Sequence, residues 1–382
     1  MIGHRHTGLA VRAMVRGDLA AIGFMMFTLL VVALAIDLAK WLGSVQTQAA
    51  ATDAPLWSVL FPYIGYRSVD IITRLLTMAC LAGGFVVTLL RHQRQDDVIL
   101  AASGAGPSFR ISALLISGLL LGLVQMAGEN WLRPEAVSRQ VAANLGDYGK
   151  RYHNNELGTQ WVVADNRALR ATFTRGDAAH LSDVMLFEGL SEPQLSHVLH
   201  ANAAHPSFRE GIWTFEQVTY WDVKNAATPK LEPRLDMPFE LDPETVRWFG
   251  VDAYYLPNAS LRAIASAPES AAASDAATAL AVRKVAIFLP VIFAFLGVSL
   301  AGQGAVGRRL SPFLLLALAA VGYLSVVSVK VFWALGIHGV LHPMLAASLP
   351  AAFALGLAIV LQLRLAGYLP TIRFKNSPKV AS

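Results

Sequence analysis

Six long blocks of apolar residues are the feature that most restricts what this chain can fold into. They cover residues 19–42, 71–90, 111–127, 285–300, 310–333 and 344–365. Residues 43–70 read as a polar connection between the first two blocks, and the Gly83–Gly84 pair in the second block would permit close helix packing. As a helix, the first block would be about 36 Å long, which exceeds the roughly 30 Å hydrocarbon core of a bilayer. Because 55% of the residues are hydrophobic and only 15% are charged, we expect a polytopic α-helical membrane protein with six transmembrane helices.

A region of different character separates the third block from the fourth. Residues 128–282 hold most of the charge and contain no block long enough to cross a bilayer. Short runs rich in β-branched and aromatic residues occur at 160–164, 168–174, 184–190, 195–201, 212–223 and 231–241. Many short strands between Gly and Pro turns favour a β-sandwich or a jelly roll. The Ala- and Ser-rich residues 260–281 would return to the membrane as a helix or linker.

The basic residues predict how the chain is oriented. An even number of spans puts both termini on one side, and that side carries most of the Lys and Arg next to the spans. The termini are therefore expected in the cytoplasm, with the strand-rich insert in the periplasm. The expected divisions are 1–133 for three helices, 134–250 for the β-jelly-roll domain, 251–282 for the return to the membrane, and 283–382 for three helices and a tail.

The segment between the second and third spans, residues 91–110, reads as a helix of about two turns. Asp96 and Asp97 would lie at its positive end, and Gly104 would stop it. A helix this short is marginal in water, where about 12 residues are needed. We therefore expect a partner protein to hold this segment.

The sequence lacks common catalytic motifs. It has no Gly-Lys-Ser/Thr phosphate loop, no His-Glu-x-x-His pair and no Gly-x-Ser-x-Gly turn. His197 and His200 lie in a strand-like run where their spacing puts them on opposite faces, so we expect no metal site and no cofactor. The net charge of +5 comes from cations at the ends of apolar blocks, which indicates membrane orientation and not nucleic-acid binding.

Basic residues also occur at the periplasmic ends of the spans, with few carboxylates expected to match them. They are Lys40, Arg74, Arg133, Arg283, Lys284 and Lys330. Each could reach water by extending its side chain, and Asp37 could pair with Lys40 one turn away. Together they also suit the phosphates of an amphiphile in the headgroup layer. We predict that Lys40, Arg74, Arg133 and Lys330 bind substrate.

Several short motifs resemble the lipopolysaccharide-export permease family LptF/LptG over nearly the whole chain. Residues 97–104 are similar to the family's coupling segment, with Asp96 in place of its glutamate and Asp97 in place of an apolar residue. Residues 128–134, the Lys284 to Pro290 spacing and the His342-Pro343 pair also match in order. Residues 158–161 and 341–343 resemble LptG more than LptF.

The resemblance implies an ABC-transporter subunit that is not itself an enzyme. Its substrate would be lipopolysaccharide, extracted from the outer leaflet of the inner membrane. Asp96, Asp97, Leu100 and Gly104 would couple to an LptB-like ATPase. Further partners would be an LptF-like second permease, a single-span LptC-like protein and a periplasmic LptA-like bridge.

Two alternatives remain open at this point. One is a polytopic membrane enzyme that modifies a lipid headgroup, for which Asp37, Glu129, His338 and His342 are the candidate bases or nucleophiles. The other is a structural subunit that does not contact lipid.

Overall fold

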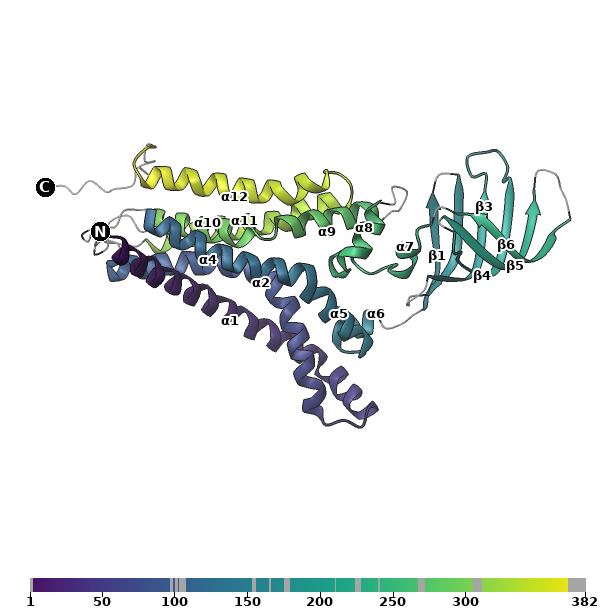
Figure 1. Ribbon diagram of the computed structural model, residues 1–382, viewed down its shortest axis with the longest axis horizontal. Coiled ribbons are helices and arrows are strands. Elements are labelled where there is room, and N and C mark those ends of the chain that lie inside the picture. The colour runs from purple at the N-terminus through teal and green to yellow at the C-terminus, as the bar shows by residue number, and fades with distance from the viewer. Residues whose placement is uncertain are drawn as a thin grey trace.

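A bundle of long helices carries a curved β-sheet at one end (Figure 1). The computed structural model describes residues 3–96, 99, 102, 108–152, 156–164, 166–174, 179–209, 211–223, 228–239, 241–266, 272–304 and 311–369. Helix α1 (Gly3–Ala51) begins, and α12 (Pro343–Leu365) ends, at the end of the bundle farthest from the sheet (Figure 1).

Five helical stretches are long and apolar enough to cross a membrane. They involve α1, α2 (Leu56–Arg94), α4 (Ser108–Ala127) with the segments that follow it, α11 (Pro312–Ile337) and α12. Helix α4 continues through a π-helical turn, η1 (Gly128–Leu132), into α5 (Arg133–Ala142). A sixth stretch consists of α9 (Ala273–Val285) and α10 (Leu289–Gly304), which meet at an angle of 62°. Pro290 lacks a backbone N–H and stands at the start of α10, where it favours this break.

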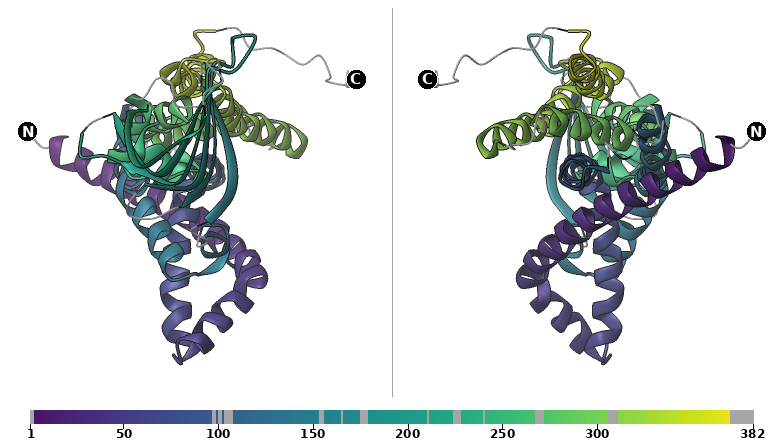
Figure 2. Two further views of the ribbon diagram at one scale, coloured as in Figure 1. Left: turned by 90° about the vertical axis from the view of Figure 1, so that its right-hand side faces the viewer. Right: turned by 90° about the vertical axis from the view of Figure 1, so that its left-hand side faces the viewer.

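Residues 43–51 and 56–70 are helical, and our reading of 43–70 as a polar connection was wrong. Helix α1 continues to Ala51 and α2 begins at Leu56, so the two form a hairpin that projects from the bundle (Figures 1 and 2). The turn contains Asp53 at φ 50° and Pro55, which is the N-cap residue of α2. Polar residues do not end a helix unless they supply a cap or a break, and residues 43–51 supply neither.

Glycines let the helices around α2 pack closely. A Cβ atom at Gly83 would overlap Ile22 of α1, and one at Gly84 would overlap the carbonyl of Ala294 in α10. Gly297 of α10 likewise faces the backbone of α2. The expectation that the Gly83–Gly84 pair permits close packing is confirmed, and α2 is consequently held between α1 and α10.

Gly122 of α4 lies against the break between α9 and α10, where a Cβ atom would overlap the carbonyl oxygen of Ile287. We expect Gly122→Ala to lower the free energy of unfolding by about 1–3 kcal/mol, because backbone must move to admit the methyl group. Gly23→Ala on α1 is the control, since its Cβ would meet no atom within 4 Å. Denaturation in detergent micelles would measure both, and equal loss in the two variants would contradict this packing.

The described strands form one antiparallel sheet in the order β1-β2-β3-β4-β5-β6. All six expected strand runs overlap observed strands, which are β1 (Glu156–Ala164), β2 (Arg167–Thr174), β3 (His180–Glu188), β4 (His197–Pro206), β5 (Ile212–Asp222) and β6 (Lys230–Pro238). Alternate residues such as Leu169, Ala171 and Phe173 point to one face, where they join a buried core.

Short helices form a neck between the bundle and the sheet. They are α5, α6 (Gly146–Tyr152), α7 (Pro243–Arg247), the 3₁₀ turn η2 (Ala253–Tyr255) and α8 (Asn258–Ser266). The side chain of Asp242 caps α7 by accepting a hydrogen bond from the Thr245 N–H at 3.1 Å. The Ala- and Ser-rich residues expected as a helix or linker contribute to α8 and α9.

Candidate functional site

Six charged side chains form a largely buried cluster at the end of the bundle nearest the sheet. We call it the charge network; its members are Asp37 of α1, Arg67, Asp70 and Arg74 of α2, Glu129 of η1 and Arg133 of α5. Our expectation that the cations at this end have few matching carboxylates was wrong for Arg74 and Arg133. Three of the six members are carboxylates, so each arginine has a partner.

Asp70 is the centre of the charge network and is only 1% exposed. Its carboxylate accepts hydrogen bonds from Arg67 Nη1 at 3.0 Å, Arg74 Nε at 2.9 Å and the Tyr148 hydroxyl at 2.6 Å. Arg67 and Arg74 stand three residues before and four residues after Asp70, a spacing that puts all three on one helix face. Arg133 Nε is also near, at 3.6 Å from Oδ1 of Asp70.

The π-helical turn η1 positions the second ion pair. Both guanidinium Nη atoms of Arg133 donate to the carboxylate of Glu129, the Nη2 to Oε1 distance being 2.8 Å. Arg133 Nε donates to Thr73 Oγ1 at 2.9 Å, and the ring of Tyr254 covers the guanidinium at 3.7 Å. Arg133 is fully buried. A short π-helical stretch within a helix is often found at functional sites.

A third pair ties α1 to α2. Arg67 Nη2 lies 2.7 Å from Oδ1 of Asp37, and the hydroxyl of Tyr63 donates to Asp37 Oδ2 at 2.5 Å. Asp37 therefore pairs with Arg67, and the expected pairing with Lys40 is not the one formed. This interaction fixes the start of the projecting hairpin.

Tyrosines of the neck bind the charge network from the sheet side. Arg74 Nη2 donates to the hydroxyl of Tyr148 at 2.9 Å and also to that of Tyr255. Burial, reinforced by the charge of Asp70, raises the pKa of Tyr148 far above its usual value. Its hydroxyl consequently stays protonated and donates to Asp70. The charge network thus connects α2 to α6 and η2, which lead to the sheet.

Exposure distinguishes the three arginines of the charge network. The side chains of Arg133 and Arg67 are 0% and 17% exposed, whereas that of Arg74 is 42% exposed. Three positive and three negative charges cancel, so the charge network does not by itself attract an anion. Arg74 is the member that can reach a ligand without leaving its partners.

The other two predicted binding residues lie on separate helices. Lys40 is exposed on α1, and its ammonium group lies 4.9 Å from the ring of Trp41; Lys150 of α6 approaches the same ring to 5.9 Å. Lys330 is exposed on α11, one turn before Trp333, whose ring packs on Tyr254 at 4.7 Å. The structure thus joins Arg74 to Arg133 through Asp70, while Lys40 and Lys330 stand apart.

At the opposite end of the bundle, Asp18 of α1 is 2% exposed and lies 2.8 Å from Arg91 Nη2 at the end of α2. Arg110, at the start of α4, lines the same small cavity of about 110 Å³. Arg91 and Arg110 bracket the expected coupling segment. Asp96 is partly exposed, just after the C-cap residue Gln95 of α2. Asp97, Leu100 and Gly104 lie outside the described residues.

A comparison with protein families matches residues 13–364 to the lipopolysaccharide export system permease LptF/LptG. The chain belongs to the LptF/LptG family. A search of curated proteins returned no match. The match covers the helices, the neck and the sheet. An LptF/LptG chain is a permease subunit of the lipopolysaccharide-export ABC transporter, a multi-pass protein of the inner membrane and not an enzyme.

Three of the four residues considered for a headgroup-modifying enzyme have structural roles in this LptF/LptG chain. Asp37 and Glu129 are held in ion pairs, and His342 accepts a 3.4 Å hydrogen bond from the N–H of Met344 at the start of α12. Within the described part of the chain, no three His, Cys, Asp or Glu side chains are placed to hold a metal ion. The family and these contacts give the enzyme alternative no support.

Sequence reasoning missed two members of the charge network of this LptF/LptG chain, Arg67 and Asp70, and the neck tyrosines that contact it, such as Tyr148. The spacing of Arg67, Asp70 and Arg74 along one helix face was a usable signal. We overlooked it because residues up to 70 were assigned to a connection. The signal for Tyr148 is weaker, since it meets Asp70 across 78 residues of sequence.

Proposed function

We propose that this chain extracts lipopolysaccharide from the outer leaflet of the inner membrane and passes it to a periplasmic bridge. The observation that carries this proposal is the family match, which spans both the membrane helices and the inserted sheet. ATP hydrolysis would take place in a separate LptB-like subunit. A second, LptF-like permease would complete the cavity, and LptC-like and LptA-like proteins would receive the lipid.

The finer topology is part of the same proposal. Counting α9 with α10 as one broken span gives six spans, with both termini in the cytoplasm and the sheet in the periplasm. The start of α1 and the end of α12 lie at the same end of the bundle, which supports this orientation (Figure 1). We retain 1–133, 134–250, 251–282 and 283–382 as the divisions. A jelly roll requires a second sheet facing the first, so for the single described sheet it remains a prediction.

We assign phosphate binding to Lys40, Arg74 and Lys330. All three have exposed cationic groups, and basic groups near the ends of spans suit the phosphates of a lipid headgroup. Arg133 was included among the binding residues, but it has no exposed surface and would have to leave Glu129 to reach a ligand. We therefore assign Arg133 a supporting role, in which it lies beside Asp70, and Asp70 in turn holds Arg74.

Arg74→Ala is expected to raise, about tenfold, the lipopolysaccharide concentration that half-maximally stimulates ATP hydrolysis by the assembled transporter. The loss of one charge-assisted hydrogen bond to a phosphate is worth about 1.5 kcal/mol at a partly exposed position. Arg139→Ala is the control, because Arg139 forms an exposed ion pair with Glu135 at this end of the molecule and is not part of the charge network. An unchanged lipopolysaccharide dependence in Arg74→Ala would remove this residue from the binding site.

Coupling to the ATPase is assigned to Asp96, Asp97, Leu100 and Gly104. The pair formed by Asp18 and Arg91 supports this assignment, because it joins the beginning of the segment to α1. The same helix carries Lys40. A displacement of the coupling segment would therefore be transmitted to a helix that carries one of the lipid-binding groups. We favour LptG over LptF for this chain, and identifying the permease that co-purifies with it would test that choice.

A further inference from the structure

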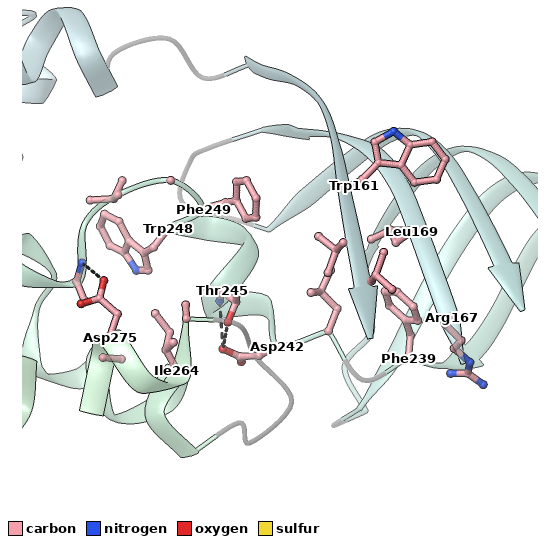
Figure 3. Close-up of a pocket in the computed structure, with 18 of the residues that line it drawn as sticks. Trp161, Arg167, Leu169, Phe239, Asp242, Thr245, Trp248, Phe249, Ile264 and Asp275 are labelled. Atoms are coloured by element: carbon pink, nitrogen blue, oxygen red, sulfur yellow. Dashed lines mark hydrogen bonds between the residues drawn. The ribbon is translucent and has the colours of Figure 1, made fainter. Parts of the chain in front are cut away.

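Apolar side chains gather in two places beside the helix bundle. One is the neck cavity, a space of about 520 Å³ between the sheet and the helices α7, α8 and α9, whose lining includes Trp161 and Phe249 (Figure 3). The other is the projecting hairpin formed by the end of α1 and the start of α2. The side chains of the neck cavity face one another, whereas those of the hairpin are exposed in the part of the chain that the structure describes.

The base of the projecting hairpin is held firmly against the neck. Tyr63 is 1% exposed and packs with Val45 and Leu145 in one buried apolar cluster. The hydroxyl oxygen of Ser44 accepts a hydrogen bond from the N–H of Gly146 at 3.3 Å. These contacts fix the direction of the hairpin, so its tip stays away from the bundle.

The tip of the hairpin has two chemically different faces. Leu56, Trp57 and Phe61 of α2 are 40%, 64% and 67% exposed, and Trp57 and Phe61 stand one helical turn apart on the same face. The end of α1 and the turn carry the exposed polar residues Gln46, Thr47, Thr52 and Asp53. Asp53 is the only Asp, Glu, Lys or Arg between residues 41 and 66. A surface divided in this way suits the boundary between hydrocarbon and water.

The hairpin points across the bundle. Helices α4, α11 and α12 run along the long axis of the molecule, which therefore lies close to the membrane normal (Figure 1). The hairpin leaves the side of the bundle at the end nearest the sheet and extends away from that axis (Figures 1 and 2). An element that extends perpendicular to the membrane normal lies in the plane of the bilayer surface.

The exposed apolar surface of α1 leads directly to the hairpin. Phe27, Val32 and Ile36 are 64%, 54% and 68% exposed along the part of α1 that is apolar enough to span a membrane. Lys40 and Trp41 follow, with the ammonium group 4.9 Å from the indole ring. Tryptophan and lysine near the end of a span are typical of the headgroup layer. The hairpin therefore begins at the level where the hydrocarbon ends.

We propose that the projecting hairpin is a membrane-surface anchor, whose face of Leu56, Trp57 and Phe61 inserts into the headgroup layer of the leaflet nearest the sheet. An indole ring favours this layer, because its body is apolar and its N–H can reach water. The face carries no cation, so uncharged or zwitterionic phospholipids are sufficient partners. The anchor fixes the depth of the charge network, since Arg67 pairs with Asp37 at the base of the hairpin. It does not depend on which lipid the chain exports.

Fluorescence quenching in proteoliposomes that contain the assembled transporter tests this anchor. An environment-sensitive fluorophore would be attached to Phe61→Cys on the apolar face, Thr47→Cys on the polar face or Phe353→Cys in the middle of α12, each in a Cys80→Ala background. The vesicles would be phosphatidylcholine with a spin label either next to the headgroup or near the end of the acyl chain.

We expect the headgroup-proximal spin label to lower the emission at position 61 about twofold, because an interfacial helix buries its apolar face about 5–10 Å deep. The deep spin label should quench position 353 instead, and neither label should quench position 47. Quenching at 353 without any at 61 would overturn the anchor. Equal quenching at 47 and 61 would contradict the division into two faces.

A charge placed on either face provides a second readout. With the fluorophore at Leu56→Cys, we expect Phe61→Asp to abolish quenching by the headgroup-proximal label, because the carboxylate stays in water. Thr47→Asp puts the same charge on the polar face and should leave the quenching unchanged. Quenching at position 353 should persist in both variants, which shows that the chain is folded and inserted. Full quenching in Phe61→Asp would contradict the anchor, as would loss of the second permease from this variant, since the face would then bind protein.

Discussion

Asp70→Ala is expected to lower the free energy of unfolding by about 3–5 kcal/mol, the cost of removing one partner from a buried ion pair. The carboxylate accepts from Arg67, Arg74 and Tyr148 while it is 1% exposed, so its loss leaves buried donors without an acceptor. Arg133, which also pairs with Glu129, would lose its second carboxylate neighbour, because its Nε lies 3.6 Å from Oδ1 of Asp70. The connection of α2 to α6 should also weaken, because the Tyr148 hydroxyl of α6 donates to this carboxylate.

Denaturation of the purified chain in detergent micelles would measure this effect, with Glu135→Ala as the control. Glu135 also pairs with an arginine at i+4, but both side chains are at least 60% exposed, so its loss should cost less than about 1 kcal/mol. Similar losses in the two variants would show that Asp70 does not hold the charge network together. The loss of unfolding free energy in Asp70→Asn should lie between the losses in Asp70→Ala and Glu135→Ala, because asparagine keeps the shape of the side chain and removes its charge.

Asp96→Lys is expected to abolish co-purification of the ATPase subunit while the chain remains folded. Asp96 follows the end of α2 and is partly exposed, so replacing it should not disturb the bundle. Reversing its charge at a docking surface places like charges together, which costs several kcal/mol when the partner group is basic.

The control for Asp96→Lys is Glu232→Lys, which makes the same kind of charge reversal on exposed β6 at the other end of the molecule. Quantifying the ATPase retained by each affinity-purified variant would decide the matter. Normal retention with Asp96→Lys would remove the coupling role from this residue.

Local patterns were sufficient to predict the strands and the close packing at α2. Alternation of apolar residues marks β2 because one face of this strand is buried. Gly83 and Gly84 indicated a close approach because each neighbouring backbone can occupy the place of a missing side chain. In both cases the information lies within a few consecutive residues.

The charge network and the neck cavity depend on contacts between distant residues, which local patterns do not show. Asp70 meets Tyr148 across 78 residues, and Tyr148 in turn meets Tyr255 across 107. Hydropathy alone also placed the beginning of α2 too late, because the helix starts at Leu56, well before the apolar block. The expectation of a basic surface rim consequently missed the carboxylates that pair with two of its members, Arg74 and Arg133.

Lipopolysaccharide export is tested most directly by transfer from proteoliposomes to a soluble periplasmic acceptor protein. The vesicles would contain this chain with its second permease, its ATPase and the single-span subunit. We predict that ATP drives transfer of intact lipopolysaccharide and that Asp96→Lys abolishes it. Lipopolysaccharide that remains in the vesicles while the intact complex hydrolyses ATP, or that reaches the acceptor equally well without ATP, would contradict the proposed function.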